Sequence, residues 1–471
     1  MQTLIIDGTI VTAEGRYKSN ILIEDGIITR IGDSTEMDEG WVIDAEDQLV
    51  LPGGVDPHVH LNLEMAGTVS SDDYYTGGKA AAFGGTTTVI DFVSQGPGSL
   101  EESVSAHRRF ADSNTSIDYS SHMNITYFDD QVAEQIAGLP DLGITSIKVF
   151  TAYNDRLRIN DGDVFRAMRV AGQNDILTMV HAENGDVIDL LIKEALQAGH
   201  TEPIWHALTR PGWGAVEASL RAFALAAQAD APVYLVHMNM AGEVDQLKYA
   251  RSQGIYAMGE TCPQYLFFNE ENLLQTDGAK FVCSPPLRSK TDNAALWQGL
   301  EDGTIQVLAT DHCPFFFNGQ QAIEYEGEMV AIPGKELGKS DFTKIPNGLP
   351  GLGDRLPLLW TYGVLPGRIS PERFVALTST NPAKIFGLYP KKGTIQVGSD
   401  GDIAIWDPKL EIKYGVNVAQ HRTDYNLYEG WKLKGMPTMV LQHGEILVEN
   451  GAWYGKPGQG KFIERVSGEV L

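Results

Sequence analysis

Residues 176–199 read ILTMVHAENGDVIDLLIKEALQAG, a short apolar run followed by an amphipathic stretch. The first part, 176–183, has the length and composition of a buried strand, and the second part, 185–199, carries apolar residues at helical spacing. The same alternation recurs from Pro52 to about residue 380. Seven or eight such units over roughly 330 residues predict a parallel sheet and favour a closed (β/α)8 barrel, the TIM-like fold, over an open sheet. The other expected strands are TTTVIDFV (86–93), IDYSSHMNI (117–125), ITSIKVFTAY (144–153), PVYLVHM (232–238), IYAMGE (255–260) and IQVLATD (305–311).

The two ends of the chain have a different pattern from the middle. Residues 1–51 and 382–450 hold strand-like runs separated by Asp-Gly and Gly turn signals, typical of a small antiparallel unit. We therefore predict one small β-sandwich domain built from 1–51 plus 382–450, flanking a barrel of residues 52–381. The Gly-rich tail, 451–471, is expected to be extended and either disordered or in contact with a neighbouring subunit.

The composition excludes several classes of partner. The 471 residues include 36 Lys plus Arg against 62 Asp plus Glu, a formal net charge of −26 that repels nucleic acid and anionic membrane surfaces. No unbroken apolar run reaches the ~18 residues of a membrane span, and the N-terminus lacks the basic region of a secretory signal. Three cysteines cannot form a disulfide framework, so a cytoplasmic location is predicted.

Five side chains that can bind metal follow or end expected strands. His58 and His60 of DPHVH (56–60) face the same way in an extended strand, which suits two ligands of one ion. An isolated His-x-His could equally be two unrelated histidines. His181, His237 and Asp311 also follow apolar strands, and the carboxyl ends of barrel strands converge on one face. Together the five favour a metal site over ordinary packing.

Lys148 lies inside the apolar strand SIKVF (146–150). A buried ammonium is costly and usually has a partner or loses its proton. Two interpretations remain: Lys148 pairs with a carboxylate such as Asp311, or it is neutral and adds CO2 to form a carbamate. The carbamate would be an anionic ligand able to bridge two metal ions.

These motifs, taken together, resemble those of the amidohydrolase superfamily, and within it the dihydropyrimidinase and D-hydantoinase family. The resemblance extends over essentially the whole chain. It rests on DPHVH (56–60), SIKVF (146–150), HAEN (181–184), VHM (236–238), ETCPQYL (260–266), CSPPLR (283–288), ATDHCP (309–314) and IPNG (345–348).

The resemblance implies two divalent metal ions and a set of site residues. Zinc is expected from the ligand types and from family habit, although manganese or cobalt also fits. The implied ligands are His58, His60 and Asp311 for one ion, His181 and His237 for the other, and Lys148, carboxylated by CO2, bridging both. Asp311 would also act as the catalytic base and acid, Tyr153 would stabilise the oxyanion, and Ser284 and Asn347 would bind the ring amide.

The implied reaction is ring opening of a hydantoin or 5,6-dihydropyrimidine to an N-carbamoyl amino acid, by hydroxide from the binuclear site. Family habit further implies a homo-oligomer, either a tetramer or a dimer. Allantoinase and cyclic-imide hydrolase remain alternatives on this scaffold, as does a non-enzymatic binding protein, which would normally have lost metal ligands. Dihydroorotases usually carry Arg soon after His-x-His, whereas this chain has Leu61-Asn62-Leu63, so a neutral ring is expected.

The chain departs from the family pattern at three places that bear on substrate preference. These are the run Leu63–Met65 after the first metal motif, Thr151 in KVFTAY, and Gly353, where relatives commonly carry Glu. GKELGKS (334–340) misses the phosphate-loop spacing by one residue and is predicted to be a solvated loop. The cysteines are interpreted as structural, and His312 as either a support for the metal site or a packed histidine.

Overall fold

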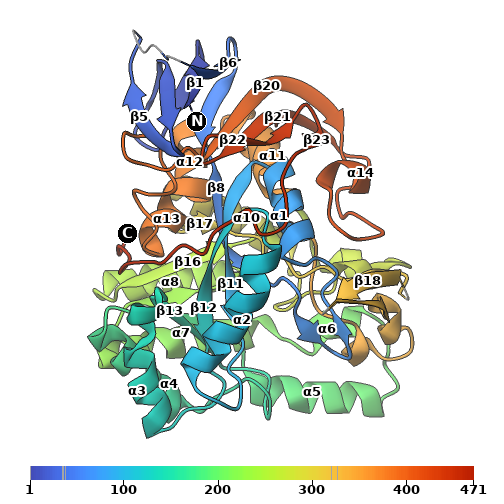
Figure 1. Ribbon diagram of the computed structural model, residues 1–471. Helices are drawn as coiled ribbons and strands as arrows, with labels where there is room; N and C mark the ends of the chain where they lie inside the picture. The colour runs from blue at the N-terminus through green and yellow to red at the C-terminus, as the bar shows by residue number, and fades with distance from the viewer. Residues whose placement is uncertain (1, 34–36, 38, 320, 326) are drawn as a thin grey trace.

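The computed structural model describes residues 2–33, 37, 39–319, 321–325 and 327–471. At its centre eight parallel strands form one sheet (Figure 1). In spatial order they are β8 (Gly54–Val59), β11 (Thr86–Val93), β12 (Asp118–Asn124), β13 (Ser146–Phe150), β14 (Leu177–His181), β15 (Val233–Leu235), β16 (Ala257–Thr261) and β17 (Val307–Leu308). Each expected strand of the middle region is present, and 86–93 has its predicted bounds.

The sheet nearly closes on itself between its first and last strands. Beyond β17 the chain stays alongside β8, where Val59 forms a parallel bridge with His312. The His60 N–H donates to the His312 carbonyl over 2.7 Å. The predicted fold class, a parallel barrel with additional β-sheets, is confirmed. Below the strand ends the interior is a packed apolar core that includes Val55, Ile90, Met179, Tyr234 and Val307.

Helices surround the barrel (Figure 1). The longer ones are α1 (Tyr74–Phe83), α2 (Leu100–Asn114), α3 (Asp130–Ala137), α4 (Asp161–Gln173), α5 (Gly185–Gln197), α7 (Gly212–Ala229), α8 (Ala241–Ser252) and α10 (Lys290–Asp302). The shorter ones are α6 (Ile204–Leu208), α9 (Pro263–Phe267), α11 (Arg355–Leu359), α12 (Pro371–Val375), α13 (Asn381–Ile385) and α14 (Val416–Ala419). The stretch that predicted the strand–helix unit becomes β14 and α5, and the Asn184 side chain caps α5 by accepting from the Val187 N–H.

Two further sheets lie against one end of the barrel. A four-stranded sheet contains β1 (Gln2–Ile6), β4 (Ile21–Glu24), β5 (Ile27–Ile31) and β6 (Gly40–Asp44). A seven-stranded sheet combines both chain ends: β2 (Thr9–Val11), β3 (Arg16–Lys18), β7 (Leu49–Pro52), β20 (Ile403–Lys413), β21 (Lys432–Gln442), β22 (Glu445–Glu449) and β23 (Ala452–Trp453). Residues from both sheets, among them Ile5, Ile21, Ile405 and Leu441, share one apolar core.

The pairing in these sheets differs in part from the antiparallel unit expected. Strands β1 and β6 pair in parallel, as do β2 and β7, while the remaining pairs are antiparallel. The domain boundaries at 51/52 and 381/382 stay a prediction.

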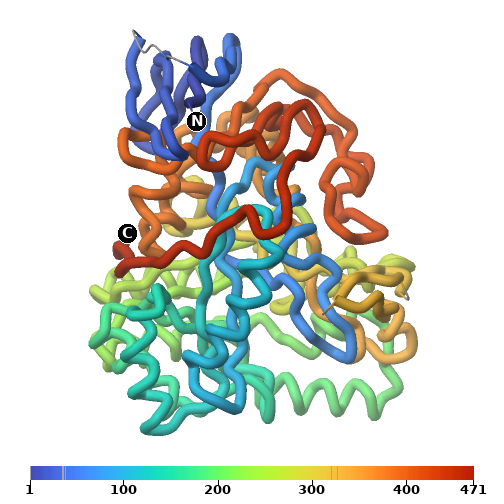
Figure 2. Tube along the Cα trace, viewed as in Figure 1, coloured from blue at the N-terminus to red at the C-terminus, as the bar shows by residue number. Residues whose placement is uncertain are grey.

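The C-terminal tail runs along the protein's own barrel (Figure 2). The Tyr119 N–H donates to the Lys461 carbonyl over 2.9 Å, and the Ile463 N–H donates to the Tyr119 carbonyl over 2.7 Å. Arg465 is buried, and its Nε donates to Ser120 Oγ over 3.0 Å. The tail is therefore extended, as expected, and it packs on its own chain. The subunit contact predicted for it stays a prediction.

A buried ion network joins the barrel to the C-terminal segment. Lys392 contacts Asp118 at the start of β12, and its Nζ lies 2.8 Å from Asp400 and 2.7 Å from Asp402. Burial alone would disfavour this ammonium, but the three carboxylates hold the pKa of Lys392 above its ordinary value. Asp118 and Asp400, with His443, have metal-binding spacing, and here the Lys392 ammonium contacts both carboxylates.

Replacing Lys392 with Met is expected to lower the free energy of unfolding by about 3–5 kcal/mol, because three buried carboxylates lose their cation. Denaturant unfolding monitored by circular dichroism measures this change. The neighbouring exposed Lys391→Met is the matched control and should leave stability within ~0.5 kcal/mol. Equal stability of the two variants would contradict the role given to the network.

Candidate metal centre

The six predicted metal ligands come together at the carboxyl ends of the barrel strands. His58 lies in β8 and Lys148 in β13, and His181 ends β14. The remaining three follow strand ends. Five of the six, namely His60, Lys148, His181, His237 and Asp311, line one cavity of about 220 Å3, and His58 is buried beside them.

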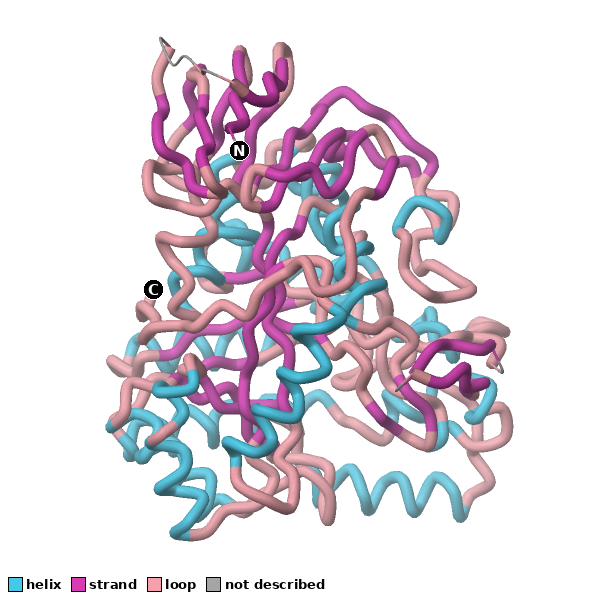
Figure 3. The backbone as a smooth tube through the Cα atoms, in the orientation of Figure 1, coloured by secondary structure: helices cyan, strands magenta, loops and turns pink. Residues whose placement is uncertain are grey.

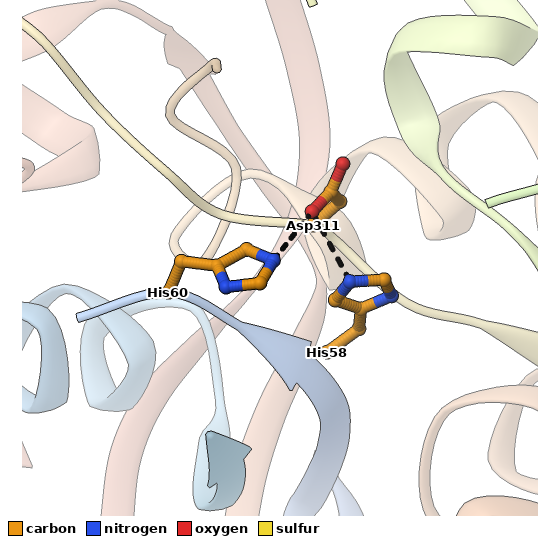
Figure 4. Close-up of side chains that lie close together, drawn as sticks. All are labelled: His58, His60 and Asp311. Carbon is orange, nitrogen blue, oxygen red and sulfur yellow. Dashed lines mark ion pairs between the residues drawn. The ribbon is translucent and has the colours of Figure 1, made fainter. Parts of the chain in front are cut away.

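One group of ligand atoms converges on Asp311 (Figure 4). Nε2 of His58 and Nε2 of His60 each lie 3.2 Å from Asp311 Oδ1. These three side chains offer ligand atoms that all lie within 4.8 Å of one another. Lys148 Nζ lies 3.0 Å from His58 Nε2, so the lysine borders the same group.

A second pair of imidazoles lies across the cavity. His181 Nδ1 and His237 Nε2 are 2.9 Å apart. Glu183 Oε2 lies 2.9 Å from His181 Nε2 and also accepts from Arg210 over 2.7 Å. Because the ionised carboxylate can only accept, His181 carries its proton on Nε2, and its Nδ1 lone pair points toward His237. The His237 Nδ1 atom is buried and has no hydrogen-bond partner among the described residues.

Glu260 orients the imidazole of His58 in a similar way. Its carboxylate contacts His58 Nδ1 and accepts from the Tyr234 hydroxyl over 2.9 Å and from the His237 N–H over 3.2 Å. This leaves His58 Nε2 facing Asp311 and Lys148. Carboxylates that hold the far nitrogen of a ligating histidine are typical of metal sites.

The protonation states suit metal ligands. Burial lowers the pKa of each of the four histidines, so each imidazole is neutral and has a lone pair. Burial also lowers the pKa of Lys148 to about 8, against the opposing effect of Asp311 and Glu260. The pKa of Asp311 stays below its ordinary value because His58 and His60 outweigh its burial. Neutral imidazoles, an ionised carboxylate and an accessible neutral amine all fit divalent ions.

Three residues of this site have a left-handed backbone conformation. His237, Asp311 and Tyr153 have φ angles of 40°, 52° and 67°, in the left-handed region that residues other than glycine rarely adopt. Such conformations cost of order 1–3 kcal/mol each and cluster at functional sites.

The three predicted substrate residues line the same cavity. Tyr153, Ser284 and Asn347 all contribute to its wall. Burial raises the pKa of Tyr153 to about 12, so its phenol keeps the proton and can donate a hydrogen bond. His206 Nε2 lies 2.9 Å from the Cys283 carbonyl and 3.2 Å from Ser284 Oγ, which holds the Ser284 loop in place. Their position in the same cavity as the predicted metal ligands agrees with the predicted substrate site, and the roles of these residues stay predictions.

Two residues that contact the predicted metal ligands, and a third that contacts one of these two, were not among the predicted site residues. Glu260 ends the strand IYAMGE, and Glu183 lies two residues after His181, so an acid at a strand end was an available signal. Arg210 is far from every motif in the sequence. Only the fold brings its guanidinium to Glu183 and within 5.6 Å of the centre of the Tyr153 ring.

The residues at which the chain departs from the family pattern lie in different surroundings in the structure. Leu63 and Met65 line the cavity, where they can contact a substrate. Thr151 Oγ1 donates to the Glu183 carbonyl over 2.8 Å and accepts from the Glu183 N–H over 3.0 Å, which joins the ends of β13 and β14. At Gly353 a Cβ would lie 2.5 Å from the Ala419 carbonyl, so a Glu side chain has no room there.

The remaining histidine and the cysteines have structural contacts. His312 Nε2 lies 3.1 Å from Asp72, and its Nδ1 accepts from the Gly351 N–H, so His312 packs where the barrel closes. All three cysteines are buried and unpaired, and burial raises the pKa of Cys283 to about 12. A thiol with this pKa is a poor nucleophile.

The barrel and its converging side chains are typical of the class of barrel proteins that bind divalent metal ions at the strand ends. The sequence profile of the amidohydrolase family matches residues 49–447. The chain belongs to the amidohydrolase family and, within it, to the dihydropyrimidinase and D-hydantoinase branch. Family membership and the ligand cluster support a binuclear site for divalent ions.

Similar proteins match along their whole length. The D-hydantoinase of Geobacillus stearothermophilus is 44% identical over 469 residues, covering 99% of this chain and 97% of that protein. The D-hydantoinase of Rhizobium radiobacter is 42% identical, with 99% of each chain covered. The crystal structure of dihydropyrimidinase from Brevibacillus agri NCHU1002 superposes with a TM-score of 0.95 at 42% identity and 100% coverage of both chains. Within the described residues no helix has the length and apolar character needed to span a bilayer.

Proposed function

We propose that this protein opens the ring of 5-substituted hydantoins and 5,6-dihydropyrimidines, giving N-carbamoyl amino acids, with preference for the D enantiomer. The observation that carries the proposal is the set of five metal-competent side chains lining one small cavity together with Tyr153, Ser284 and Asn347. The preference for D substrates follows from relatives named D-hydantoinase at 42–44% identity.

The ligands of the proposed site are those the resemblance implied. His58, His60 and Asp311 would hold one ion, His181 and His237 would hold the other, and Lys148 carboxylated by CO2 would be a ligand of both. Zinc is the proposed metal. When bound, two such ions acidify water and polarise a carbonyl group.

Side chains and backbone groups of the protein would then transfer the proton and position the substrate. Asp311 presents Oδ1 to both imidazoles, so its Oδ2 would accept a proton from the attacking water and pass it to the ring nitrogen as the water oxygen bonds to the carbonyl carbon and the C–N bond breaks. The Tyr153 hydroxyl donates to the carbonyl oxygen as negative charge develops there. Backbone groups at Ser284 and Asn347 hold the ring amide. The cavity wall at Leu63 and Met65 receives the exocyclic substituent.

A substrate panel tests the proposal directly. Purified, metal-loaded protein is assayed with 5,6-dihydrouracil, hydantoin, both enantiomers of a 5-substituted hydantoin, allantoin, dihydroorotate and a cyclic imide. Ring opening of dihydrouracil and the D-hydantoin is expected. Failure to open any ring would refute the proposal, and activity confined to allantoin or the imide would favour the alternative enzymes.

Tyr153→Phe should lower kcat by about 10²–10³ because one donor to the developing oxyanion is removed. Metal content, measured by atomic emission, should stay at the wild-type level. Tyr256→Phe, at an exposed tyrosine, serves as the control and should have wild-type kcat. A Tyr153→Phe enzyme with unchanged kcat would show that the hydroxyl has no part in the reaction.

We further propose a homo-oligomer, either a tetramer or a dimer, in the cytoplasm. Three buried cysteines without disulfides agree with a reducing compartment. Light scattering on the purified protein gives the mass of the assembly, and a monomer would contradict this proposal.

A further inference from the structure

The segment GKELGKS, predicted to be a solvated loop, contains a fully buried lysine. Lys335 begins the short helix η4 (Lys335–Gly338), and its side chain is 1% exposed. The prediction was therefore wrong for this residue. Neighbouring Lys339 is exposed, as expected for a loop, so the burial of Lys335 is specific.

Within the part of the chain that the structure describes, the partners of the Lys335 ammonium are carbonyl groups and not carboxylates. Its Nζ donates to the Val282 carbonyl over 2.9 Å and to the Pro346 carbonyl over 3.0 Å. Among the residues that the structure describes, no carboxylate oxygen lies within 4.0 Å of Nζ. Burying a cation without a counter-charge is costly. The lysine is therefore poorly explained by ion pairing or by apolar packing.

The two carbonyls belong to the loops that carry the proposed ring-binding residues. Val282 lies two residues before Ser284, and Pro346 directly precedes Asn347. The Gly348 N–H also donates to the Val282 carbonyl over 3.1 Å, so the loops meet at this point. Ser284 and Asn347 line the cavity from these loops. One ammonium thus cross-links both halves of the ring-binding surface.

Lys335 also lies at the base of the hairpin formed by β18 (Gln321–Tyr325) and β19 (Glu328–Ile332). Its N–H donates to the Phe316 carbonyl over 2.8 Å, where the hairpin leaves the barrel. At the other end, the Tyr325 hydroxyl donates to Glu64 over 2.6 Å, beside the second small hairpin of β9 (Glu64–Met65) and β10 (Thr68–Val69) (Figure 3). The lysine therefore anchors the segment that returns toward the cavity wall.

We propose that Lys335 is a positioning residue that sets the spacing between the backbone at Ser284 and the backbone at Asn347. This inference rests on the proposed function. The ring amide must meet both loops at once, and a side chain that holds them together raises ring affinity without touching the substrate. Since Lys335 has no hydrogen bond or ion pair with a predicted metal ligand among the described residues, its loss affects ring binding more than the chemical step.

The test compares Lys335→Met with Lys339→Met. Lys335→Met removes the donors and keeps a long apolar chain, and the KM for dihydrouracil and the D-hydantoin should rise at least about 10-fold, the effect of about one lost hydrogen bond. The kcat should stay within about 3-fold of wild type, and metal content should be unchanged. Hydrogen–deuterium exchange should accelerate in peptides covering 282–288 and 345–349. Lys339→Met should match wild type in all four measurements.

Several outcomes would overturn the inference. These are an unchanged KM, exchange rates unchanged in both loops, or a loss of kcat accompanied by loss of metal. If Lys335→Met does not fold, Lys335→Gln replaces it, because its amide keeps two N–H donors on a shorter stem, and a smaller rise in KM is expected. An inactive wild-type enzyme would refute the proposed function, whereas an active enzyme with normal KM in the variants would refute only the role of Lys335.

Discussion

Lys148→Ala is expected to lose bound metal and ring-opening activity together, with activity falling by more than about 10³-fold. Lys148 is the residue placed to border both ligand groups, since its Nζ lies 3.0 Å from His58 and its side chain lines the cavity with His181 and His237. Burial lowers its pKa to about 8, which makes the neutral amine needed for reaction with CO2 accessible near neutral pH. Metal analysis and the substrate assay, made on the same preparation, measure the two losses.

Short carboxylic acids provide a specific check on the carbamate. Acetate or propionate can occupy the space left in Lys148→Ala and supply two oxygen ligands, so partial recovery of metal and activity is expected. Lys193→Ala, on the exposed surface of α5, is the matched control and should behave as wild type. Full activity of Lys148→Ala without added acid would refute the role of the lysine, and an unmodified ammonium in an experimental density map would refute its carboxylation.

Asp311→Asn should lower kcat by about 10²–10⁴, because an amide cannot accept the proton that the mechanism passes to the leaving nitrogen. The aspartate lies 3.2 Å from both His58 and His60, and those imidazoles hold its pKa below the ordinary value, so it is ionised over the working pH range. Steady-state kinetics with dihydrouracil measures the effect.

Measuring metal content distinguishes the proposed role of Asp311 as a metal ligand from its proposed role in proton transfer. An Asn oxygen can still approach the ion, so Asp311→Asn should retain more metal than Lys148→Ala while being nearly as inactive. Asp245→Asn, at an exposed position in α8, is the control. Activity of Asp311→Asn within a few-fold of wild type would show that another group moves the proton.

Much of the fold follows from local sequence patterns. The strand expected at residues 86–93 has the same bounds as β11. Residues 176–199 contain a strand and a capped helix, because periodicity and capping depend on residues only a few positions apart. The candidate metal ligands were also accessible from the sequence. His58, His60, His181, His237 and Asp311 end or follow strands, and parallel strands in a barrel must end on the same face.

What the amino-acid sequence alone determined was therefore the order of strands and helices, the barrel, and the side chains at the strand ends. The tertiary structure alone decided which distant groups support them. Glu260 contacts His58, which lies 202 positions away in the sequence, and Arg210 contacts Glu183. Lys335, in a segment predicted to be a solvated loop, donates to the carbonyls of Val282 and Pro346. The physical reason is that periodicity reports which face of an element is buried, whereas a contact between distant segments depends on how the closed barrel places its loops.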